Sequence, residues 1–240
     1  MLEIKNISKT YSKSSKKAIS DINLTIEDGD IYGFIGPNGS GKSTTIKCMV
    51  GIHDFEGDIL LNGLSIKANP IEFKKITSYV PDNPDLYEHL TGIGYIDFVS
   101  NIYNVGSKKK ELIHKYAKMF DIESNLGDAI KNYSHGMKQK IALIAALIHN
   151  PKLLVLDEPF VGLDPMTTHN LKDVMKELCN NGTIIFFSSH VLEVVEKLCN
   201  KIAIIKNGKI IISGPTDEVK GNSSLEDVFL DLYENKEELS

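Results

Sequence analysis

The sequence lacks the features that mark secreted, disulfide-bonded or membrane-spanning proteins. Its 240 residues include only three cysteines, Cys48, Cys179 and Cys199, whose spacing is not that of a zinc or redox site. We expect these cysteines to be small apolar packing residues in a reducing compartment. The longest apolar runs, such as 141–148, fall well short of the roughly 20 residues that a bilayer-spanning helix requires. Residues 1–5 also lack the pattern of a signal peptide.

The chain also lacks an excess of positive charge. The chain has 27 Lys and Arg residues against 32 Asp and Glu residues, which gives a formal net charge of −5. Proteins that bind nucleic acid through bulk electrostatics are normally basic, so we expect no nucleic-acid partner. Hydrophobic residues make up 42% and charged residues 25% of the chain, which is typical of a globular protein with one sizeable core.

The apolar pattern predicts an α/β protein that is interrupted by a helical segment. Short apolar runs predict strands at 2–11, 18–27, 30–35, 58–61, 77–80, 153–156, 183–187 and 202–205. Apolar residues recur at helical spacing between about 82 and 147, as at Ile93, Ile96 and Val99. Further helices are predicted at 42–50, 171–178, 191–198 and 225–238. Buried strands that alternate with helices predict a parallel sheet covered on both faces.

A glycine-rich segment between a predicted strand and a predicted helix has the pattern of a phosphate-binding loop. The segment is Gly36, Pro37, Asn38, Gly39, Ser40, Gly41, Lys42, Ser43 and Thr44, and it fits G-x-x-x-x-G-K-[ST]. Glycines let backbone N–H groups approach phosphate oxygens, Lys42 would reach the β- and γ-phosphates, and the Ser43 hydroxyl would ligate Mg²⁺. The alternative is a chance glycine-rich turn, which the correct strand and helix on either side argue against.

Two adjacent carboxylates end another predicted strand. Asp157 and Glu158 directly follow the apolar run 153–156. Beside a bound Mg-nucleotide, Asp157 would hold the metal directly or through a water, and Glu158 would polarise the attacking water. An apolar strand that ends in Asp-Glu is common and has a structural interpretation when it stands alone. The phosphate-binding loop upstream favours the catalytic interpretation.

The segment 133–140, Tyr-Ser-His-Gly-Met-Lys-Gln-Lys, points to one family among the nucleotide-binding proteins. It lies upstream of Asp157, opens a helix, and resembles the Leu-Ser-Gly-Gly-Gln signature of ATP-binding cassette (ABC) ATPases. The other elements of that family occur in order, so the resemblance covers essentially the whole chain. Within the family, the sequence resembles the bacterial drug, antibiotic and lipid export branch of ABC transporter ATP-binding proteins.

The resemblance implies a fold and a domain organisation. The fold is that of an α/β P-loop NTPase (RecA-like), in which a mixed-sheet core carries an N-terminal antiparallel β-subdomain and a helical signature subdomain. We expect one ABC ATPase domain over residues 1–240. Its parts are the nucleotide-binding core with the β-subdomain (1–81 and 151–222), the helical subdomain (82–150) and a C-terminal helix (223–240).

The resemblance also assigns roles to single residues. Tyr11 stands where an aromatic ring stacks on adenine, and His190 where a histidine contacts the γ-phosphate. Ser134 and Gly136 would form a second anion-binding helix end that closes over the nucleotide of a second, head-to-tail subunit. Each residue has an ordinary alternative: Tyr11 as a surface aromatic, His190 as a residue at a helix start, and Ser134 as an N-cap.

Four positions near these motifs require separate interpretation. Asp82 replaces the glutamine that usually contacts Mg²⁺, and we interpret it as a variation, common in the export branch, that still offers a metal ligand. His135 and Met137 replace glycine and glutamine in the signature, and His135 is hypothesised to tune the closed dimer with pH. Asp164 belongs to a loop that resembles one at the dimer interface, and it also has the position of a helix N-cap.

The implied function is ATP hydrolysis, with ATP and Mg²⁺, by the nucleotide-binding subunit of a membrane transporter. The short tail 225–230 resembles those of export ATPases, so we expect an exporter. The partners would be a transmembrane permease and a second ABC ATPase subunit, and the chain would be cytoplasmic, on the inner face of the membrane. Exposed residues at 82–103, such as Leu86 and Tyr87, would dock the permease. The alternatives are a soluble cassette protein acting on ribosomes or DNA, and a nucleotide-binding module without turnover, which Glu158 and His190 argue against.

Overall fold

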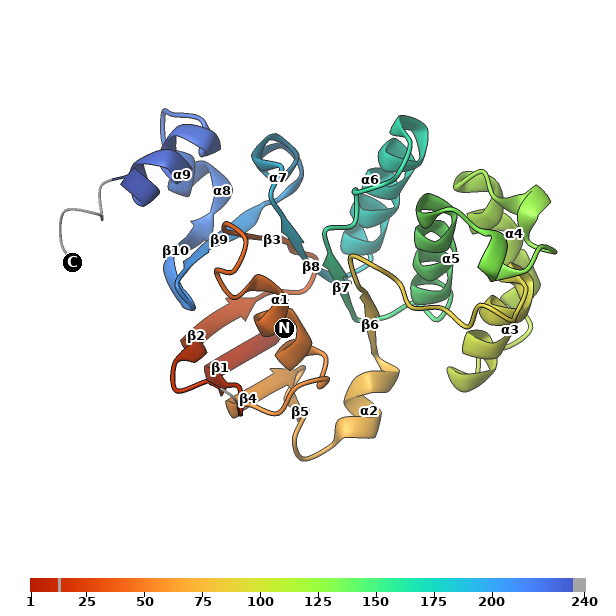
Figure 1. Cartoon of the computed structure of the whole chain (residues 1–240), viewed down its shortest axis with the longest axis horizontal. Helices are drawn as coiled ribbons and strands as arrows, with labels where there is room; N and C mark the ends of the chain where they lie inside the picture. The colour runs from red at the N-terminus through yellow and green to blue at the C-terminus, as the bar shows by residue number, and fades with distance from the viewer. Residues whose placement is uncertain (13, 235–240) are drawn as a thin grey trace.

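The computed structural model of the chain describes residues 1–12 and 14–234 and contains two β-sheets (Figure 1). The smaller sheet is antiparallel, with the strand order β2-β1-β4-β5. Its strands are β1 (Leu2–Thr10), β2 (Lys17–Ile26), β4 (Glu56–Leu61) and β5 (Leu64–Ser65). This sheet is the N-terminal antiparallel β-subdomain that the family resemblance implied.

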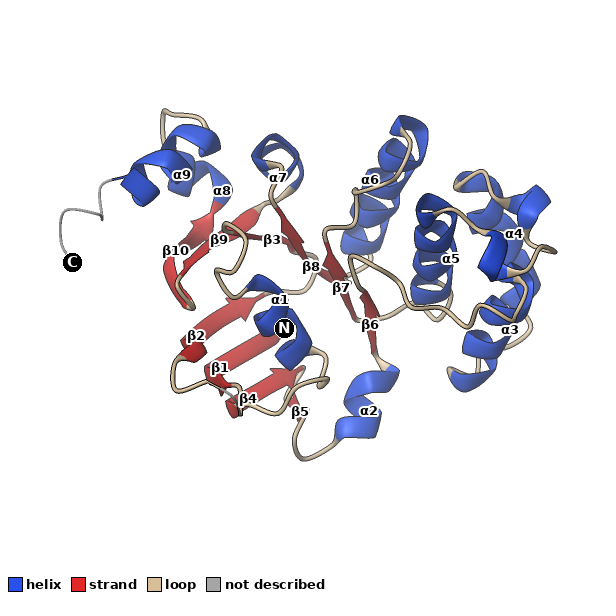
Figure 2. Cartoon of the chain, in the orientation of Figure 1, coloured by secondary structure: helices blue, strands red, loops and turns tan. Residues whose placement is uncertain are grey.

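The larger sheet has the strand order β10-β9-β3-β8-β7-β6 (Figure 2). Its strands are β3 (Ile31–Ile35), β6 (Thr77–Val80), β7 (Leu153–Asp157), β8 (Ile184–Ser189), β9 (Lys201–Lys206) and β10 (Lys209–Pro215). Neighbours from β9 to β6 run parallel, whereas β10 pairs antiparallel with β9. The mixed sheet implied by the resemblance is therefore confirmed, and the residue pattern alone missed β10.

Helices cover the larger sheet and extend from one end of it. They are α1 (Lys42–Met49), α2 (Pro70–Lys75), α3 (Gly92–Ile102), α4 (Lys109–Met119), α5 (His135–Leu147), α6 (Pro165–Asn180), α7 (Leu192–Leu198), α8 (Thr216–Lys220) and α9 (Leu225–Glu234). Helices α3, α4 and α5 gather at one end of the molecule (Figure 1), where the helical segment was predicted. The short helices α2 and α8 were not predicted. The predicted C-terminal helix is described as far as Glu234, and its remaining positions lie outside the described residues.

The strands of the larger sheet contribute to two separate hydrophobic cores. In β8, Ile184 and Phe186 pack into the core that contains α1 and the smaller sheet, whereas Ile185 and Phe187 pack into the core formed with α5, α6 and α7. Side chains of a strand point alternately to its two faces, so both faces of this sheet are covered. Because both faces are buried, these strands contain continuous apolar runs, as the sequence shows. Helix α1 packs between the two sheets.

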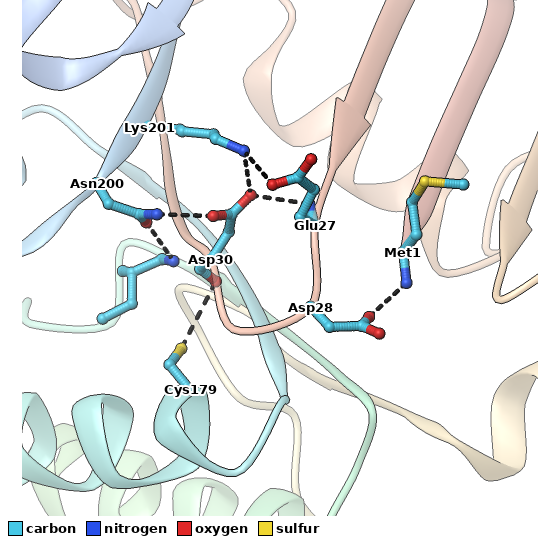
Figure 3. A network of polar contacts seen from close by, with 8 residues as sticks. Met1, Glu27, Asp28, Asp30, Cys179, Asn200 and Lys201 are labelled. Carbon is cyan, nitrogen blue, oxygen red and sulfur yellow. Dashed lines mark hydrogen bonds and ion pairs between the residues drawn. The ribbon is translucent and has the colours of Figure 1, made fainter.

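A buried carboxylate fastens the beginning of β3, the strand that leads into the glycine-rich loop (Figure 3). Asp30 is only 5% exposed and accepts hydrogen bonds from Asn200 Nδ2 at 2.6 Å and from Lys201 Nζ at 2.9 Å. It also accepts a bond from the backbone N–H of Glu27 at 2.8 Å. A charge that leaves water needs such partners. The network joins the end of β2 to the beginnings of β3 and β9.

The structure also tests two expectations drawn from what the sequence lacks. All three cysteines are buried, as predicted, and burial raises the pKa of the Cys48 thiol to about 11. This thiol is therefore a neutral packing group at physiological pH. Within residues 1–12 and 14–234, no helix combines the length and apolar character needed to cross a bilayer.

Candidate nucleotide-binding and hydrolysis site

The glycine-rich loop joins β3 to α1 and borders a hollow of about 200 Å³. Gly41 caps α1 with a φ of 113°, a left-handed conformation that glycine adopts without strain. Gly36 is buried against β9, where a Cβ atom would lie 2.4 Å from the carbonyl oxygen of Ile205. The first residues of α1, whose N–H groups have no partners within the helix, line the hollow. This geometry suits an anion such as phosphate.

Lys42 contributes a positive charge to the lining of this hollow, and the residue is 7% exposed. Its Nζ atom donates hydrogen bonds to the carbonyl oxygens of Gly36 at 2.6 Å and Pro37 at 3.3 Å. Burial lowers the pKa of Lys42, and the negative charges of Glu158 and Asp157 oppose that effect. The fold therefore brings the lysine and the predicted carboxylates, which are distant in sequence, into one electrostatic environment.

Ser188 on β8 holds the two carboxylate residues at the end of β7. Its hydroxyl donates a hydrogen bond to Asp157 Oδ1 at 2.5 Å. The backbone N–H of Glu158 donates to the carbonyl oxygen and to Oγ of Ser188, both at 3.2 Å. Glu158 has a φ of 49°, which is unusual for a residue other than glycine. The sequence indicated no role for Ser188, although it lies two residues before the predicted γ-phosphate contact, His190.

His190 follows β8 and contacts the predicted catalytic carboxylate. Its Nδ1 atom lies 2.9 Å from Glu158 Oε2, and its backbone N–H donates to the same oxygen at 3.3 Å. The Glu158 side chain is mostly buried, whereas the imidazole ring is exposed. The pair fixes the direction of the carboxylate and leaves the ring accessible to a ligand.

The three predicted magnesium ligands offer oxygen atoms, which Mg²⁺ prefers. Ser43 and Asp82 are exposed and Asp157 is buried. The buried hydroxyl of Tyr79 has no hydrogen-bond partner, and burial together with the charges of Asp157 and Asp82 raises its pKa, so both carboxylates lie near this phenol. Among the described residues, no group of three His, Cys, Asp or Glu side chains is arranged to hold a metal. The set fits an ion that takes its remaining ligands from a nucleotide and water.

Tyr11 lies at the edge of the glycine-rich loop. Its hydroxyl is 3.1 Å from Thr44 Oγ1, and its ring meets that of His53 edge-on, with the centroids 5.5 Å apart. The side chain is 39% exposed, so part of the ring is free to contact a ligand. Base stacking by Tyr11 stays a prediction.

The signature segment begins α5. The Oγ atom of Ser134 accepts a hydrogen bond from the backbone N–H of Met137 at 3.3 Å, so the N-cap interpretation holds within one chain. Ser134 is exposed, and a Cβ atom on Gly136 would lie 2.6 Å from the carbonyl oxygen of Gly162. The signature therefore packs closely against the loop that follows Glu158. A contact from Ser134 to a second subunit's nucleotide stays a prediction.

Asp164 fastens the same loop at its other end. It accepts hydrogen bonds from the backbone N–H of Thr167 at 2.8 Å and from Thr167 Oγ1 at 2.7 Å, which confirms its predicted position as the N-cap of α6. It also pairs with Lys140 of α5 at 2.9 Å. The bonds from Thr167 and Lys140 hold the pKa of Asp164 well below its usual range. Lys140 was not predicted, because its partner lies on another element.

The prediction that Leu86 belongs to an exposed docking surface is wrong. Leu86 is 6% exposed because it packs into the core of the helical segment. Tyr87, by contrast, is 51% exposed, and its ring contacts those of Tyr95 and Phe98. Because Phe98 is also exposed, we define Tyr87, Tyr95 and Phe98 as the aromatic patch.

The mixed sheet, the glycine-rich loop between β3 and α1, and the carboxylates at the end of β7 define a P-loop NTPase. A family model described as "ABC transporter" matches residues 19–161. The chain therefore belongs to the ABC transporter family, as an ATP-binding subunit with the ABC-type ATPase domain.

Curated relatives agree with this assignment. The uncharacterized ABC transporter ATP-binding protein YhcH of Bacillus subtilis is 37% identical over 88% of this chain and 68% of its own length. The ABC-type transporter ATP-binding protein EcsA of Bacillus subtilis is 32% identical over 97% of this chain and 95% of its own. The linearmycin resistance ATP-binding protein LnrL of the same species is 35% identical over 89% and 69%.

Solved structures share the fold. An ATP-binding subunit of an ABC transporter superposes with a TM-score of 0.93 at 30% identity, covering 98% of this chain and all of that one. The ATP-binding cassette MJ0796, in a dimeric post-hydrolysis state bound to ADP and Pi, has a TM-score of 0.82 at 22% identity, covering 90% and 99%.

Proposed function

We propose that this chain hydrolyses Mg-ATP as the nucleotide-binding subunit of a membrane exporter and that two subunits form each site head to tail. The observation that carries the proposal is the convergence of Lys42, Glu158 and His190, while the helix tip at Ser134 is exposed. In Figure 1, α1 and α5 lie well apart, on either side of β7 and β6. One chain therefore offers two anion-binding helix ends, and the proposal assigns them to the nucleotides of two different subunits.

Each residue of the site has a chemical task in this proposal. The N-terminus of α1 and Lys42 bind the β- and γ-phosphates and stabilise the charge that develops as water attacks in line. Glu158 accepts a proton from that water, and His190 holds the Glu158 carboxylate and donates to the γ-phosphate. Ser43, Asp82 and Asp157 would hold Mg²⁺, which would neutralise negative charge on the phosphates as the reaction proceeds.

The second subunit contributes the N-terminus of its own α5. Ser134 and Gly136 would approach the γ-phosphate from the side opposite Lys42, so bound ATP would hold the dimer together and hydrolysis would release it. The close packing of Gly136 against Gly162 supports a mechanical link between the signature of one site and Glu158 of the other. The structural relative MJ0796, which has the same fold, is a dimer bound to ADP and Pi.

The aromatic patch is the proposed docking surface for a transmembrane permease, which would hold this subunit on the cytoplasmic face of the membrane. Tyr87 and Phe98 are exposed on the helical segment, and their ring centroids are 5.5 Å apart. Exposed aromatic side chains that gather in this way often anchor protein–protein contacts. The formal net charge of −5 gives little support for an RNA or DNA partner.

Replacing Tyr87 and Phe98 by serine should lower co-purification of the permease by about tenfold or more, because buried aromatic anchors carry much of an interface's free energy. The ATPase activity of the isolated chain should stay unchanged. The measurement is quantitative mass spectrometry of the multi-span membrane protein retained from a detergent extract. Ile71→Ser, an exposed apolar change on α2, is the matched control. Unchanged retention would contradict the docking surface, and retention of ribosomal or DNA material instead would favour the alternative function.

A further inference from the structure

The turn between β9 and β10 is hydrogen-bonded to the glycine-rich loop. Asn207 and Gly208 have φ values of 49° and 75°, as in a two-residue hairpin turn of type I′. The backbone N–H of Gly208 donates a hydrogen bond to the carbonyl oxygen of Ser40 at 2.8 Å. The carbonyl oxygen of Gly208 accepts one from the backbone N–H of Ser20 on β2, also at 2.8 Å. The turn therefore ties the middle of the loop to the smaller sheet.

Ile205, three residues before Gly208, supports both ends of the same loop. Its carbonyl oxygen packs against Gly36, where a side chain has no room, and its Cδ1 atom would be 3.2 Å from a Cβ on Gly41. Strand β9 also pairs with β3 up to Ile35 and Ile204, just before these contacts. A shift of Ile205 would therefore move the backbone that lines the hollow at the glycine-rich loop.

Helix α9 reaches Ile205 through a tyrosine. The hydroxyl of Tyr233 donates a hydrogen bond to the carbonyl oxygen of Ile205 at 2.8 Å. Lys206 Nζ lies 4.5 Å from the centroid of the Tyr233 ring and donates to the carbonyl oxygen of Tyr233 at 3.2 Å. The ring also packs on Phe229, with the centroids 4.6 Å apart. These contacts fix the end of α9 against the strand that supports the loop.

The beginning of α9 is anchored on a different element. Leu225 is fully buried, and its backbone N–H donates to Glu196 Oε2 on α7 at 3.0 Å. Figure 1 shows α9 beside α8, above β10 and close to α7. Helix α9 therefore contacts α7 at its beginning and β9 at its end. Its position is coupled to both of these elements, and through β9 to the glycine-rich loop.

We propose that Tyr233 is a positioning residue for the nucleotide and acts through Ile205 and the β9–β10 turn on the shape of the glycine-rich loop. The inference rests on the proposed nucleotide site. Tyr233 touches no reacting atom in this account, so its hydroxyl affects how well the loop is preorganised for phosphate and leaves the chemical step alone. Any partner that displaces α9 would therefore change the affinity of the site for nucleotide.

Tyr233→Phe tests the proposal, because it removes the hydroxyl and keeps the ring against Phe229 and Lys206. The loss of one hydrogen bond should weaken ADP binding by about three- to tenfold. The KM for ATP should rise by a similar factor while kcat stays near the wild-type value. Isothermal titration with ADP gives the affinity, and hydrogen exchange should become faster in the peptide 36–44.

Thr216→Val is the matched control. The buried Thr216 hydroxyl donates to the carbonyl oxygen of Cys199 at 2.7 Å, next to the far end of β9. Its removal should lower the melting temperature as Tyr233→Phe does and leave ADP affinity unchanged. The proposal is overturned if Tyr233→Phe binds ADP as the wild type does, or if Thr216→Val weakens ADP binding equally. Failure of the wild-type chain to bind ADP would instead overturn the nucleotide site itself.

Discussion

Glu158→Gln should lower the turnover of ATP by about 10²- to 10⁴-fold and leave ATP binding intact. The amide keeps the shape of the carboxylate and can still accept the bond from the backbone N–H of His190, but it cannot accept a proton from water. The contacts of Lys42 with its own loop involve neither oxygen of Glu158. Because bound ATP would then persist, the variant should accumulate as a dimer in gel filtration with ATP.

Glu193→Gln provides the control for this change. Glu193 lies in α7, forms an exposed ion pair with Lys197 at 2.6 Å and does not line the hollow at the glycine-rich loop. The same chemical change there should leave turnover and elution volume as in the wild type. Phosphate release by Glu158→Gln at the wild-type rate, or its elution only as a monomer with ATP, would contradict the catalytic role.

Lys42→Ala should weaken ATP binding by about 10- to 100-fold, since hydrogen bonds to charged groups contribute about 1.5–3 kcal/mol. Turnover at saturating ATP should fall by about 10²-fold or more, because the same ammonium group stabilises the transferring phosphoryl group. The change also leaves the nearby charges of Asp157 and Glu158 without their cation, so they would repel the phosphates. Titration with ATP and steady-state phosphate release measure the two effects.

Lys47→Ala separates this role from a general effect of charge, because Lys47 belongs to the last turn of the same helix. That variant should bind and hydrolyse ATP as the wild type does. The apo proteins should also be compared by thermal unfolding, since Lys42 has hydrogen bonds to Gly36 and Pro37 that alanine removes. Wild-type affinity in a folded Lys42→Ala protein would be incompatible with the proposed site.

The parts of the site that the sequence predicted are those whose chemistry restricts the residue type. The loop requires glycine at position 36, where neighbouring atoms leave no room for a side chain, and at position 41, where the backbone is left-handed. The motif can therefore be recognised in the sequence alone. Asp164 was recognised as an N-cap because capping is a local interaction. Partnerships such as that of Asp164 with Lys140 depend on how helices are placed, and a single sequence does not contain them.

The same distinction explains what the sequence did not predict in the fold. Ser188 reaches Asp157 only because β7 and β8 pair with these residues opposite each other. Leu86 was predicted to lie in a helical segment, but it lies in the loop between β6 and α3, where no helical or strand period indicates which side chains are buried. Strand β10 is only partly buried, and its apolar run of three isoleucines is shorter than the runs of four in β7 and β8, so the pattern did not mark it as a strand. The domain boundaries and the roles of the site residues remain predictions.

The most direct test of the account is to mix two inactive variants, Lys42→Ala and Ser134→Asp. Aspartate keeps the N-cap of α5 but places a negative charge where the partner's phosphate would bind. If each site combines the loop of one subunit with Ser134 of the other, a mixed dimer has one intact site, and random exchange restores about a quarter of wild-type turnover. If the mixture stays as inactive as its two components while the chains do exchange, the shared site proposed for this protein does not exist.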